Sequence, residues 1–257
     1  MRSHELFSLA GKTALVTGGG RGLGRVMAQA LAEAGADIAV ASRDEEACAA
    51  AAREIGQSTR RRVFSGKLDI SDKGSVDGFM AHVTETFGPV DILVNNSGST
   101  WGARFEAMPL DKWENVLRVN LTGTFLMCQA ALPGMKQRKW GRIINVASVA
   151  GIRGSPHFMH ASGYAASKGG IIALTKELAV KFARDGIVVN AVAPGFFPTR
   201  MSKPLTDAYG EQISRSVPMG RMGVEEDLKG VAVFLASEAS RYVTGQVIAV
   251  DGGSTTA

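Results

Sequence analysis

A tyrosine and a lysine four residues apart are the side chains of this sequence best suited to proton transfer. Tyr164 and Lys168 stand in the run Gly-Tyr-Ala-Ala-Ser-Lys-Gly-Gly, after which apolar residues recur at helical spacing. On a helix this spacing puts both side chains on one face. A phenol has an unperturbed pKa of about 10, and a neighbouring ammonium lowers it, so such a tyrosine can exchange protons near neutral pH. A solvated surface tyrosine and lysine would give the same spacing, so the pair needs support from the rest of the chain.

A glycine-rich turn near the start of the chain is a second candidate for chemistry. The pattern predicts a strand, a turn and a helix over residues 12–34 and another strand over 37–42. The turn reads Gly18-x-x-x-Gly22-x-Gly24, which differs in spacing from G-x-G-x-x-G but meets the same demands. These demands are positive φ angles, close approach of backbone to a pyrophosphate, and free amides at a helix N-terminus. In this βαβ setting the turn predicts a dinucleotide site, with a ligand-free glycine turn as the alternative.

The residues at the end of the second strand bear on which dinucleotide is bound. Ser42 and Arg43 stand where folds that prefer NAD place an acidic residue on the ribose 2′-hydroxyl. A hydroxyl and a guanidinium suit a 2′-phosphate, and Arg21 in the glycine turn adds a second positive charge. This favours NADP(H). NAD(H) remains possible if Asp44, the next residue, faces the ribose.

The remaining chain alternates strands with helices. Further strands are expected at 63–68, 90–94, 142–147, 187–193 and 247–250, and helices at 44–57, 73–87, 110–138, 225–236 and from about residue 164. Polar residues and glycine follow several of these strands, which is where an open parallel sheet binds its ligands. We therefore expect one α/β domain over residues 1–257, a doubly wound, Rossmann-like parallel sheet with helices on both faces. Within it, residues 196–222, of which 202–221 look irregular, are expected to form a mobile substrate lid.

Composition and charge narrow the possible partners. The formal charge of +5 raises the question of nucleic acid, but the only dense basic run, Arg60–Arg62, is short and reads as a solvated loop or strand edge. A small phosphate-bearing ligand explains the local basic residues better than a nucleic-acid groove does. We expect no nucleic-acid partner and no membrane association, because no apolar run reaches the length of a span and Met1–Phe7 lacks a signal-peptide core. The cysteines, Cys48 and Cys128, read as reduced core residues of a cytoplasmic protein.

No metal site is expected. His157 and His160 form an H-x-x-H pair in a polar loop, without a neighbouring cluster of cysteines or carboxylates.

Nearly the whole chain resembles the short-chain dehydrogenase/reductase family. Asn120, Ser148, Tyr164 and Lys168 are similar to its catalytic tetrad, and Asn95-Asn96-Ser97-Gly98 resembles its Asn-Asn-Ala-Gly segment. By this resemblance Ser148 and Tyr164 act on the substrate carbonyl, Lys168 holds the nicotinamide ribose, and Asn120 holds a water. The full set of cofactor-binding residues that we expect comprises Gly18, Arg21, Gly22, Leu23, Gly24, Ser42, Arg43, Asp69, Ile70, Asn96, Gly98, Tyr164, Lys168, Pro194, Gly195 and Phe197.

The resemblance also carries expectations about the substrate, with two departures. Ser97 stands where the family has alanine, and the segment between Ser148 and Tyr164 is longer than is common. Several stretches are similar to 3-oxoacyl reductases, the rhamnolipid-pathway type among them, while gluconate 5-dehydrogenases share the framework. The leading hypothesis is an NADP(H)-dependent reductase of 3-oxoacyl thioesters. A polyol or sugar-acid dehydrogenase and a non-catalytic nucleotide-sensing protein are the alternatives. Trp101, Phe158 and Phe196 are candidate substrate contacts, and the family implies a homotetramer.

Overall fold

A single parallel sheet organises the chain in the computed structural model, which describes residues 2–256. In this part of the chain the strands are β1 (Thr13–Thr17), β2 (Asp37–Ser42), β3 (Val63–Lys67), β4 (Ile92–Asn95), β5 (Gly141–Val146), β6 (Ile187–Pro194) and β7 (Val247–Val250). Their order across the sheet is β3-β2-β1-β4-β5-β6-β7, and all pairs are parallel. The chain therefore reverses its direction of winding between β1 and β4, which is where doubly wound sheets open a crevice for ligands. The predicted fold class is confirmed.

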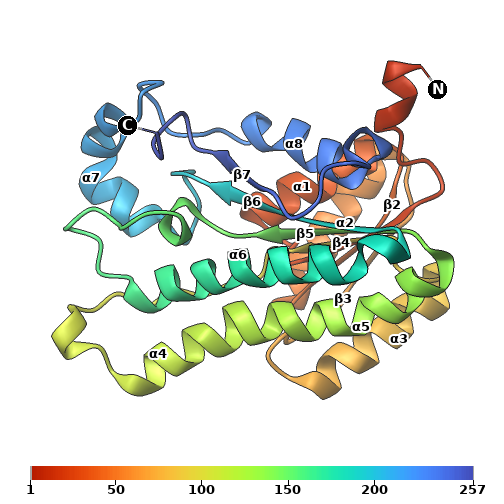
Figure 1. Cartoon of the computed structure of the whole chain (residues 1–257), viewed down its shortest axis with the longest axis horizontal. Coiled ribbons are helices and arrows are strands. Elements are labelled where there is room, and N and C mark those ends of the chain that lie inside the picture. The colour runs from red at the N-terminus through yellow and green to blue at the C-terminus, as the bar shows by residue number, and fades with distance from the viewer. Residues whose placement is uncertain (1, 257) are drawn as a thin grey trace.

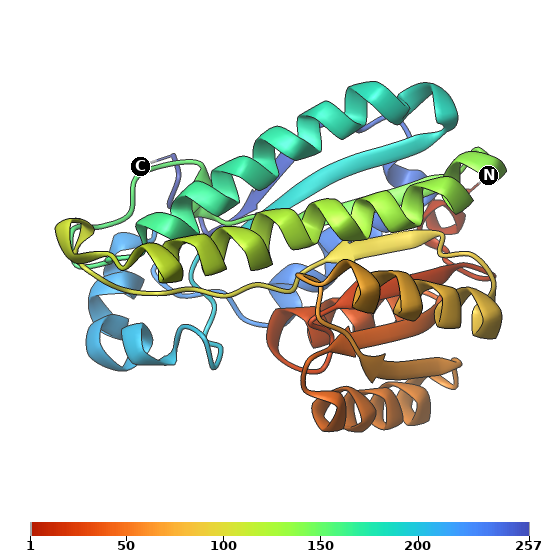
Figure 2. The ribbon, with the colours of Figure 1, turned by 90° about the horizontal axis from the view of Figure 1, so that it is seen from below.

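Helices cover both faces of the sheet (Figures 1 and 2). They are α1 (Gly22–Glu33), α2 (Glu45–Thr59), α3 (Lys73–Phe87), α4 (Leu110–Leu117), α5 (Gly123–Arg138), α6 (Ser162–Phe182), α7 (Lys203–Ser216) and α8 (Glu226–Ala236). Short 3₁₀ turns are η1 (Ser3–Phe7), η2 (Phe105–Ala107), η4 (Val149–Gly151), η5 (Ala183–Asp185) and η6 (Glu238–Ser240), and η3 (Arg118–Thr122) is a π-helical turn. Side chains of β1 alternate between two cores: Val16 packs with α1, α2 and α8, and Leu15 packs with α3, α5 and α6.

Two expected elements differ from the structure. Residues 202–221 were expected to be irregular, but α7 occupies most of them, stabilised by the i,i+4 ion pairs Lys203–Asp207 and Arg215–Glu211 and by burial of Ile213. The helix expected over 110–138 is divided by η3 into α4 and α5. Hydrophobic periodicity alone reveals neither the ion pairs of α7 nor the π-helical turn.

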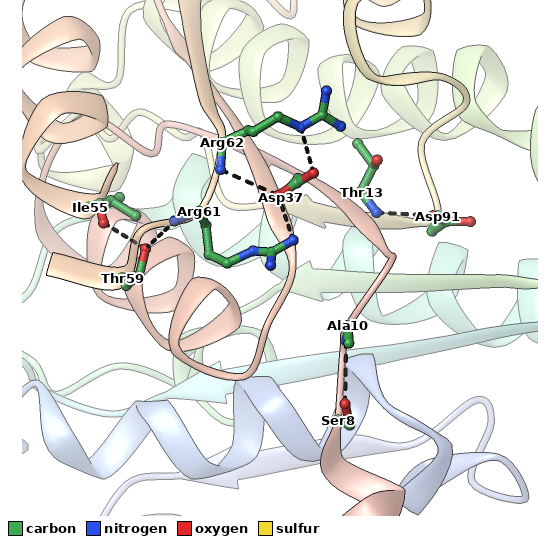
Figure 3. A network of polar contacts seen from close by, with 9 residues as sticks. All are labelled: Ser8, Ala10, Thr13, Asp37, Ile55, Thr59, Arg61, Arg62 and Asp91. Carbon is green, nitrogen blue, oxygen red and sulfur yellow. Dashed lines mark hydrogen bonds and ion pairs between the residues drawn. The ribbon is translucent and has the colours of Figure 1, made fainter. Parts of the chain in front are cut away.

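The basic run Arg60–Arg62 lies in the loop between α2 and β3, as expected, at the edge of the sheet where the strands begin (Figure 3). Arg61 and Arg62 pair with Asp37 at 2.7 and 2.8 Å. Burial pushes the pKa of Asp37 up, but the hydrogen bond from Arg62 and the charge of Arg61 hold it below its usual value. These arginines therefore link the start of β2 to the loop that leads into β3.

The described residues show neither a membrane-crossing helix nor a metal cluster. None of the helices within residues 2–256 is both long and apolar enough to cross a membrane. The same residues contain no group of three His, Cys, Asp or Glu side chains placed to hold a metal ion. His157 and His160 are both exposed, and Cys48 and Cys128 are buried with free thiols.

Candidate active site

The ends of β1, β4 and β5 come together at one edge of the sheet. Thr17 pairs with Asn95, and Asn95 pairs with Asn145, so the polar segments after these three strands start side by side. The Asn96 side-chain amide donates to the carbonyl oxygens of Thr17 and Gly18 at 3.1 and 3.3 Å, and the Thr17 hydroxyl accepts from the Asn96 amide N–H. These bonds fasten the loop after β4 to the glycine turn.

The glycine turn has the conformation and the space that a dinucleotide requires. Gly18 and Gly22 have φ angles of 66° and 53°, which favour glycine. A Cβ on Gly24 would lie 2.3 Å from the side-chain nitrogen of Asn96, so only glycine fits beneath the turn. Helix α1 begins at Gly22, earlier than Arg25 where the sequence placed it, and the preceding Arg21 provides no side-chain cap. The first amides of α1 are thus free for an anion, and the residues present fit a pyrophosphate.

Arg21 and Asp44 face each other where the 2′-group of the cofactor ribose is expected to bind. Arg21 pairs with Asp44 at 2.9 Å, and Asp44 also caps α2 by accepting from the Ala47 amide. The pKa of Asp44 is lowered, first by that backbone bond and then by the charges of Arg21 and Arg200. Asp44, the residue that would favour NAD, is therefore already engaged by a helix terminus and an arginine. Arg200 is a neighbour that the sequence reasoning missed.

The loops after β2 and β3 bring Ser42 and Asp69 to the same edge. The Ser42 hydroxyl accepts from the Asp44 amide at 3.2 Å. Asp69 accepts two hydrogen bonds from Ser71, and its pKa is lowered chiefly by the Ser71 hydroxyl, with the charge of Arg43 acting in the same direction. Both residues are half-buried, whereas Arg43 is exposed and its charge acts on Asp69.

Three residues expected in the cofactor site direct their side chains into the core. Leu23 packs against the core on the α1 face, Ile70 is 5% exposed and fills the space beside Gly123, and Phe197 is 5% exposed and packs against Gly223. At Ile70 and Phe197 only the backbone remains to face a ligand. Pro194 ends β6 and Gly195 follows it, where a Cβ on Gly195 would lie 2.8 Å from the Cα of Asp251.

Tyr164 and Lys168 lie together on α6, as the spacing predicted. The Lys168 Nζ is 5.5 Å from the centroid of the Tyr164 ring and donates to the carbonyl oxygen of Val146 at 2.6 Å. Lys168 is only 3% exposed, and burial lowers its pKa to about 8. The ammonium was expected to lower the pKa of Tyr164. Instead burial raises the pKa of Tyr164, and a hydrogen bond with the Ser148 side chain is what opposes this rise.

Ser148 reaches Tyr164 because the turn that follows β5 packs tightly on α6. A Cβ on Gly151, in η4, would lie 2.6 Å from the carbonyl carbon of Lys168, so glycine permits the approach. Ser148 precedes η4, accepts from the Ala150 amide at 3.2 Å, and is 9% exposed. The Ser148 hydroxyl therefore lies beside Tyr164 in a region that is largely shielded from water.

Asn120 is fully buried in the π-helical turn η3. Its side chain accepts from the Ser99 amide at 2.7 Å and donates to the Ser99 carbonyl and the Ser167 hydroxyl, both at 2.9 Å. Its own carbonyl accepts from the Thr124 hydroxyl at 2.7 Å. The sequence indicated an exposed position or a kink, and the π-turn is that kink. Ser167, which completes the contact with α6, was missed although it lies beside Lys168 in the sequence.

The candidate substrate residues are less closely grouped. Trp101 is 45% exposed and lies under the Lys112 ammonium, 5.1 Å from its ring centroid, so it is a rim residue. Phe158 and Phe196 are half-buried, on the segments after β5 and β6. Ser97, which replaces the family alanine, is also half-buried, and its Oγ lies 3.2 Å from where a Cβ on Gly18 would be.

Comparison with known proteins identifies the chain. A family model described as enoyl-(acyl carrier protein) reductase matches residues 18–255. The chain belongs to the short-chain dehydrogenase/reductase family. As a member of this family it is an oxidoreductase that acts on alcohol or ketone groups.

The relatives of this short-chain dehydrogenase/reductase include enzymes of two substrate classes. A 2-dehydro-3-deoxy-D-gluconate 5-dehydrogenase of Bacillus subtilis is 41% identical over 252 residues, covering 97% of either chain. A 3-oxoacyl-[acyl-carrier-protein] reductase of Aquifex aeolicus is 39% identical over 245 residues, covering 95% of this chain and 98% of the relative. Among solved structures, a gluconate 5-dehydrogenase from Burkholderia cenocepacia in complex with NADP and tartrate is 38% identical, with a TM-score of 0.94 over the full length of both chains.

Proposed function

We propose that this enzyme uses NADPH to reduce the 3-oxo group of acyl thioesters. The observation that carries the reaction type is Tyr164 beside the Ser148 side chain and close to the buried ammonium of Lys168. When bound, the cofactor supplies the hydride. The substrate carbonyl oxygen lies between the two hydroxyls, and both stabilise the negative charge that develops on it.

Tyr164 is the proposed proton donor in the direction of reduction. Burial raises its pKa, so the phenol stays protonated at neutral pH and has a proton to give. As the proton leaves, the positive charge of Lys168 stabilises the developing phenolate. In the oxidative direction the same phenolate removes the proton of the alcohol.

Asn120 is proposed to help a water molecule carry protons between Lys168 and solvent. Because Gly98 lacks a side chain, space remains at its Cβ position, 3.4 Å from the Asn120 Oδ1 and 3.8 Å from the Lys168 Nζ. A water in this space would relay a proton to Lys168. Asn120 also fixes the loop after β4 through its bonds to Ser99.

The preference for NADP(H) is supported by the charges at the end of β2. Arg21, Arg43 and Arg200 act there against Asp44 and Asp69, and Asp44 is already capped and paired. A 2′-phosphate adds the negative charge that this cluster lacks. NADP in the related gluconate 5-dehydrogenase structure supports the same choice.

The acyl thioester is favoured by apolar side chains exposed beside the site. The segments after β4, β5 and β6 (residues 99–108, 149–161 and 196–222) follow the strand ends that carry the site, and they expose Trp101, Ile152, Met201 and Met219. These side chains give an acyl chain apolar surface to cover. The 41% identical gluconate-type relative supports the second candidate, oxidation of a polyol or sugar acid.

A substrate panel tests this proposal. Purified enzyme is assayed with 3-oxoacyl thioesters, sugar acids and simple ketones, using NADPH and NADH in turn. We expect the highest kcat/KM with a 3-oxoacyl thioester and NADPH. Faster turnover of a sugar acid would establish the second candidate, and cofactor binding without turnover of any compound would indicate a nucleotide-sensing protein.

Location and assembly are also proposals. Buried free Cys48 and Cys128 suit the reducing cytoplasm. Phe125 on α5 and Val180 on α6 are 44% and 81% exposed, which supports association of these neighbouring helices with another copy in a homotetramer. Light scattering of the purified protein measures the mass directly, and a monomer would contradict this proposal.

A further inference from the structure

Two aromatic rings connect the segment that follows β5 with helix α7, which follows β6. Phe158, in the unusually long segment after β5, stacks on Tyr209 of α7 with ring centroids 4.5 Å apart and planes inclined by 27°. His157 meets Phe158 edge-on at 5.6 Å. Neither Phe158 nor Tyr209 takes part in the proton-transfer centre around Tyr164. The stack is therefore a structural feature that the proposed reaction leaves unexplained.

The stack also has a backbone connection to the segment that follows β4. The Ala103 amide, in the loop after β4, donates to the carbonyl oxygen of His160 at 3.0 Å. Since Phe158 is two residues from His160, all three segments meet around the aromatic pair. They lie together at the left of Figure 1, where the parallel strands end and α6 begins.

Helix α7 changes direction at the residue that forms the stack. Tyr209 has φ −133° and ψ 15°, which are not helical values, and Gly210 follows it. A break in a helix loses backbone hydrogen bonds, so it persists where other contacts hold it. Ile213, on the far side of the break, is 1% exposed and fixes that half of α7 to the protein. The half from Lys203 to Tyr209 contacts the segment after β5 through the ring of Phe158.

We propose that Phe158 and Tyr209 are specificity-determining residues that select substrates by the length of their apolar chain; this rests on the proposed function. The rings lie on two of the segments that follow the strand ends carrying the site, and the same group of segments exposes Trp101, Ile152 and Met219. Each methylene that becomes fully buried there improves binding about threefold to fourfold. A short polar substrate gains nothing from these side chains.

The test compares chain lengths in the full-length enzyme. Wild type, Phe158→Ala, Tyr209→Ala and the double variant are assayed with NADPH and 3-oxoacyl N-acetylcysteamine thioesters of four, eight and twelve carbons. In wild type, KM should fall as the chain lengthens. In each single variant the advantage of the longest chain should shrink by roughly fivefold to tenfold, mainly through KM. The double variant should lose little more than either single variant, because the rings act as one unit.

Matched controls distinguish the effect of losing the aromatic stack from a general loss of structure. Tyr242 is a fully exposed tyrosine near the start of β7, at the opposite edge of the sheet, so Tyr242→Ala should leave the chain-length preference unchanged. Tyr209→Phe keeps the ring and should retain the preference. NADPH affinity, measured by fluorescence titration, should be the same in every variant. Hydrogen exchange of the α7 amides should accelerate in Phe158→Ala and not in Tyr242→Ala.

The outcomes distinguish this inference from the proposed function. Methyl ketones of matching chain lengths are assayed in parallel. If no thioester is reduced but ketone turnover still depends on chain length through Phe158, the thioester assignment fails and the specificity role holds. If neither series shows chain-length dependence, or if Phe158→Ala keeps the wild-type preference with unchanged exchange in α7, the proposal is overturned.

Discussion

The two edges of the sheet hold their buried cations in different ways. Where the strands begin, charged side chains are paired: Asp37 binds Arg61 and Arg62, and the 3% exposed Arg142 meets Glu238 at 3.0 Å. Where the strands end, Lys168 is equally buried, yet it forms no ion pair with any residue of 2–256 and donates instead to a backbone carbonyl.

This difference separates a charge that stabilises the fold from a charge that is suited to proton transfer. A buried charge that is paired keeps its ionisation state and joins two elements. A buried charge without a counter-ion has a shifted pKa, which is the property that proton transfer requires. The two buried cations therefore predict opposite responses to mutation: loss of stability without loss of activity when the Arg142 pair is changed, and loss of activity without loss of stability when Lys168 is changed.

The largest expected effect is on Lys168→Met. Removing the ammonium takes away the charge proposed to stabilise the Tyr164 phenolate, so kcat should fall by roughly 10²- to 10⁴-fold. The Tm should stay the same or rise, because methionine fills a similar volume and has no charge to desolvate. Steady-state kinetics and thermal unfolding on the same samples measure both quantities. A large drop in Tm would mean that Lys168 is a structural charge.

The pH dependence of stability gives a second measure of Lys168. Its folded pKa of about 8 lies below the unfolded value of about 10.4, so the folded state binds protons more weakly. This penalty, roughly 3 kcal/mol, is present in full below pH 8 and disappears as the pH rises toward 10. Relative to Lys168→Met, wild type should therefore become more stable between pH 8 and 10. Urea unfolding of both proteins across this range would reveal a constant difference if the pKa were unshifted.

The next effect concerns the cofactor. Arg43→Glu should weaken NADPH binding by roughly 10- to 100-fold, since a charge-assisted bond to phosphate is replaced by repulsion. NADH binding should change much less. Fluorescence titration with both cofactors measures this, with Lys67→Glu as an exposed control at the end of β3. Equal losses for NADPH and NADH would show that Arg43 does not contact the 2′-phosphate.

The smallest effect should come from the ion pair between Arg142 and Glu238, where the strands begin. Burial lowers the pKa of Arg142, and the charge of Glu238 opposes this. Glu238→Gln keeps an acceptor for Arg142 and for the Trp140 indole but removes the charge, so the free energy of unfolding should fall by about 1–2 kcal/mol. Turnover should be unchanged. A change in kcat without a change in stability would break the contrast between the two edges.

The parts of the site that the sequence predicted well are those with short-range patterns. The strand–turn–helix around Gly18 and Gly22 and the pair Tyr164 and Lys168 follow from spacing, and the structure places them as expected. The family resemblance added Ser148 and Asn120, and both lie beside this pair in the fold.

The missed features depend on contacts between distant segments. The core packing of Phe197 depends on Gly223, and the charge near Asp44 comes from Arg200 on another loop. The rise in the pKa of Tyr164 follows from burial, which helical spacing does not report. The ring contact between Phe158 and Tyr209 likewise exists only once α7 packs against the segment after β5.

The most direct test of the proton-transfer centre is Tyr164→Phe, which removes one oxygen atom and leaves the ring. Single-turnover reduction of the best substrate from the panel should slow by roughly 10³-fold or more, while NADPH affinity and Tm remain at wild-type values. Wild-type turnover in this variant would contradict the assignment of Tyr164 as proton donor, and with it the proposed mechanism.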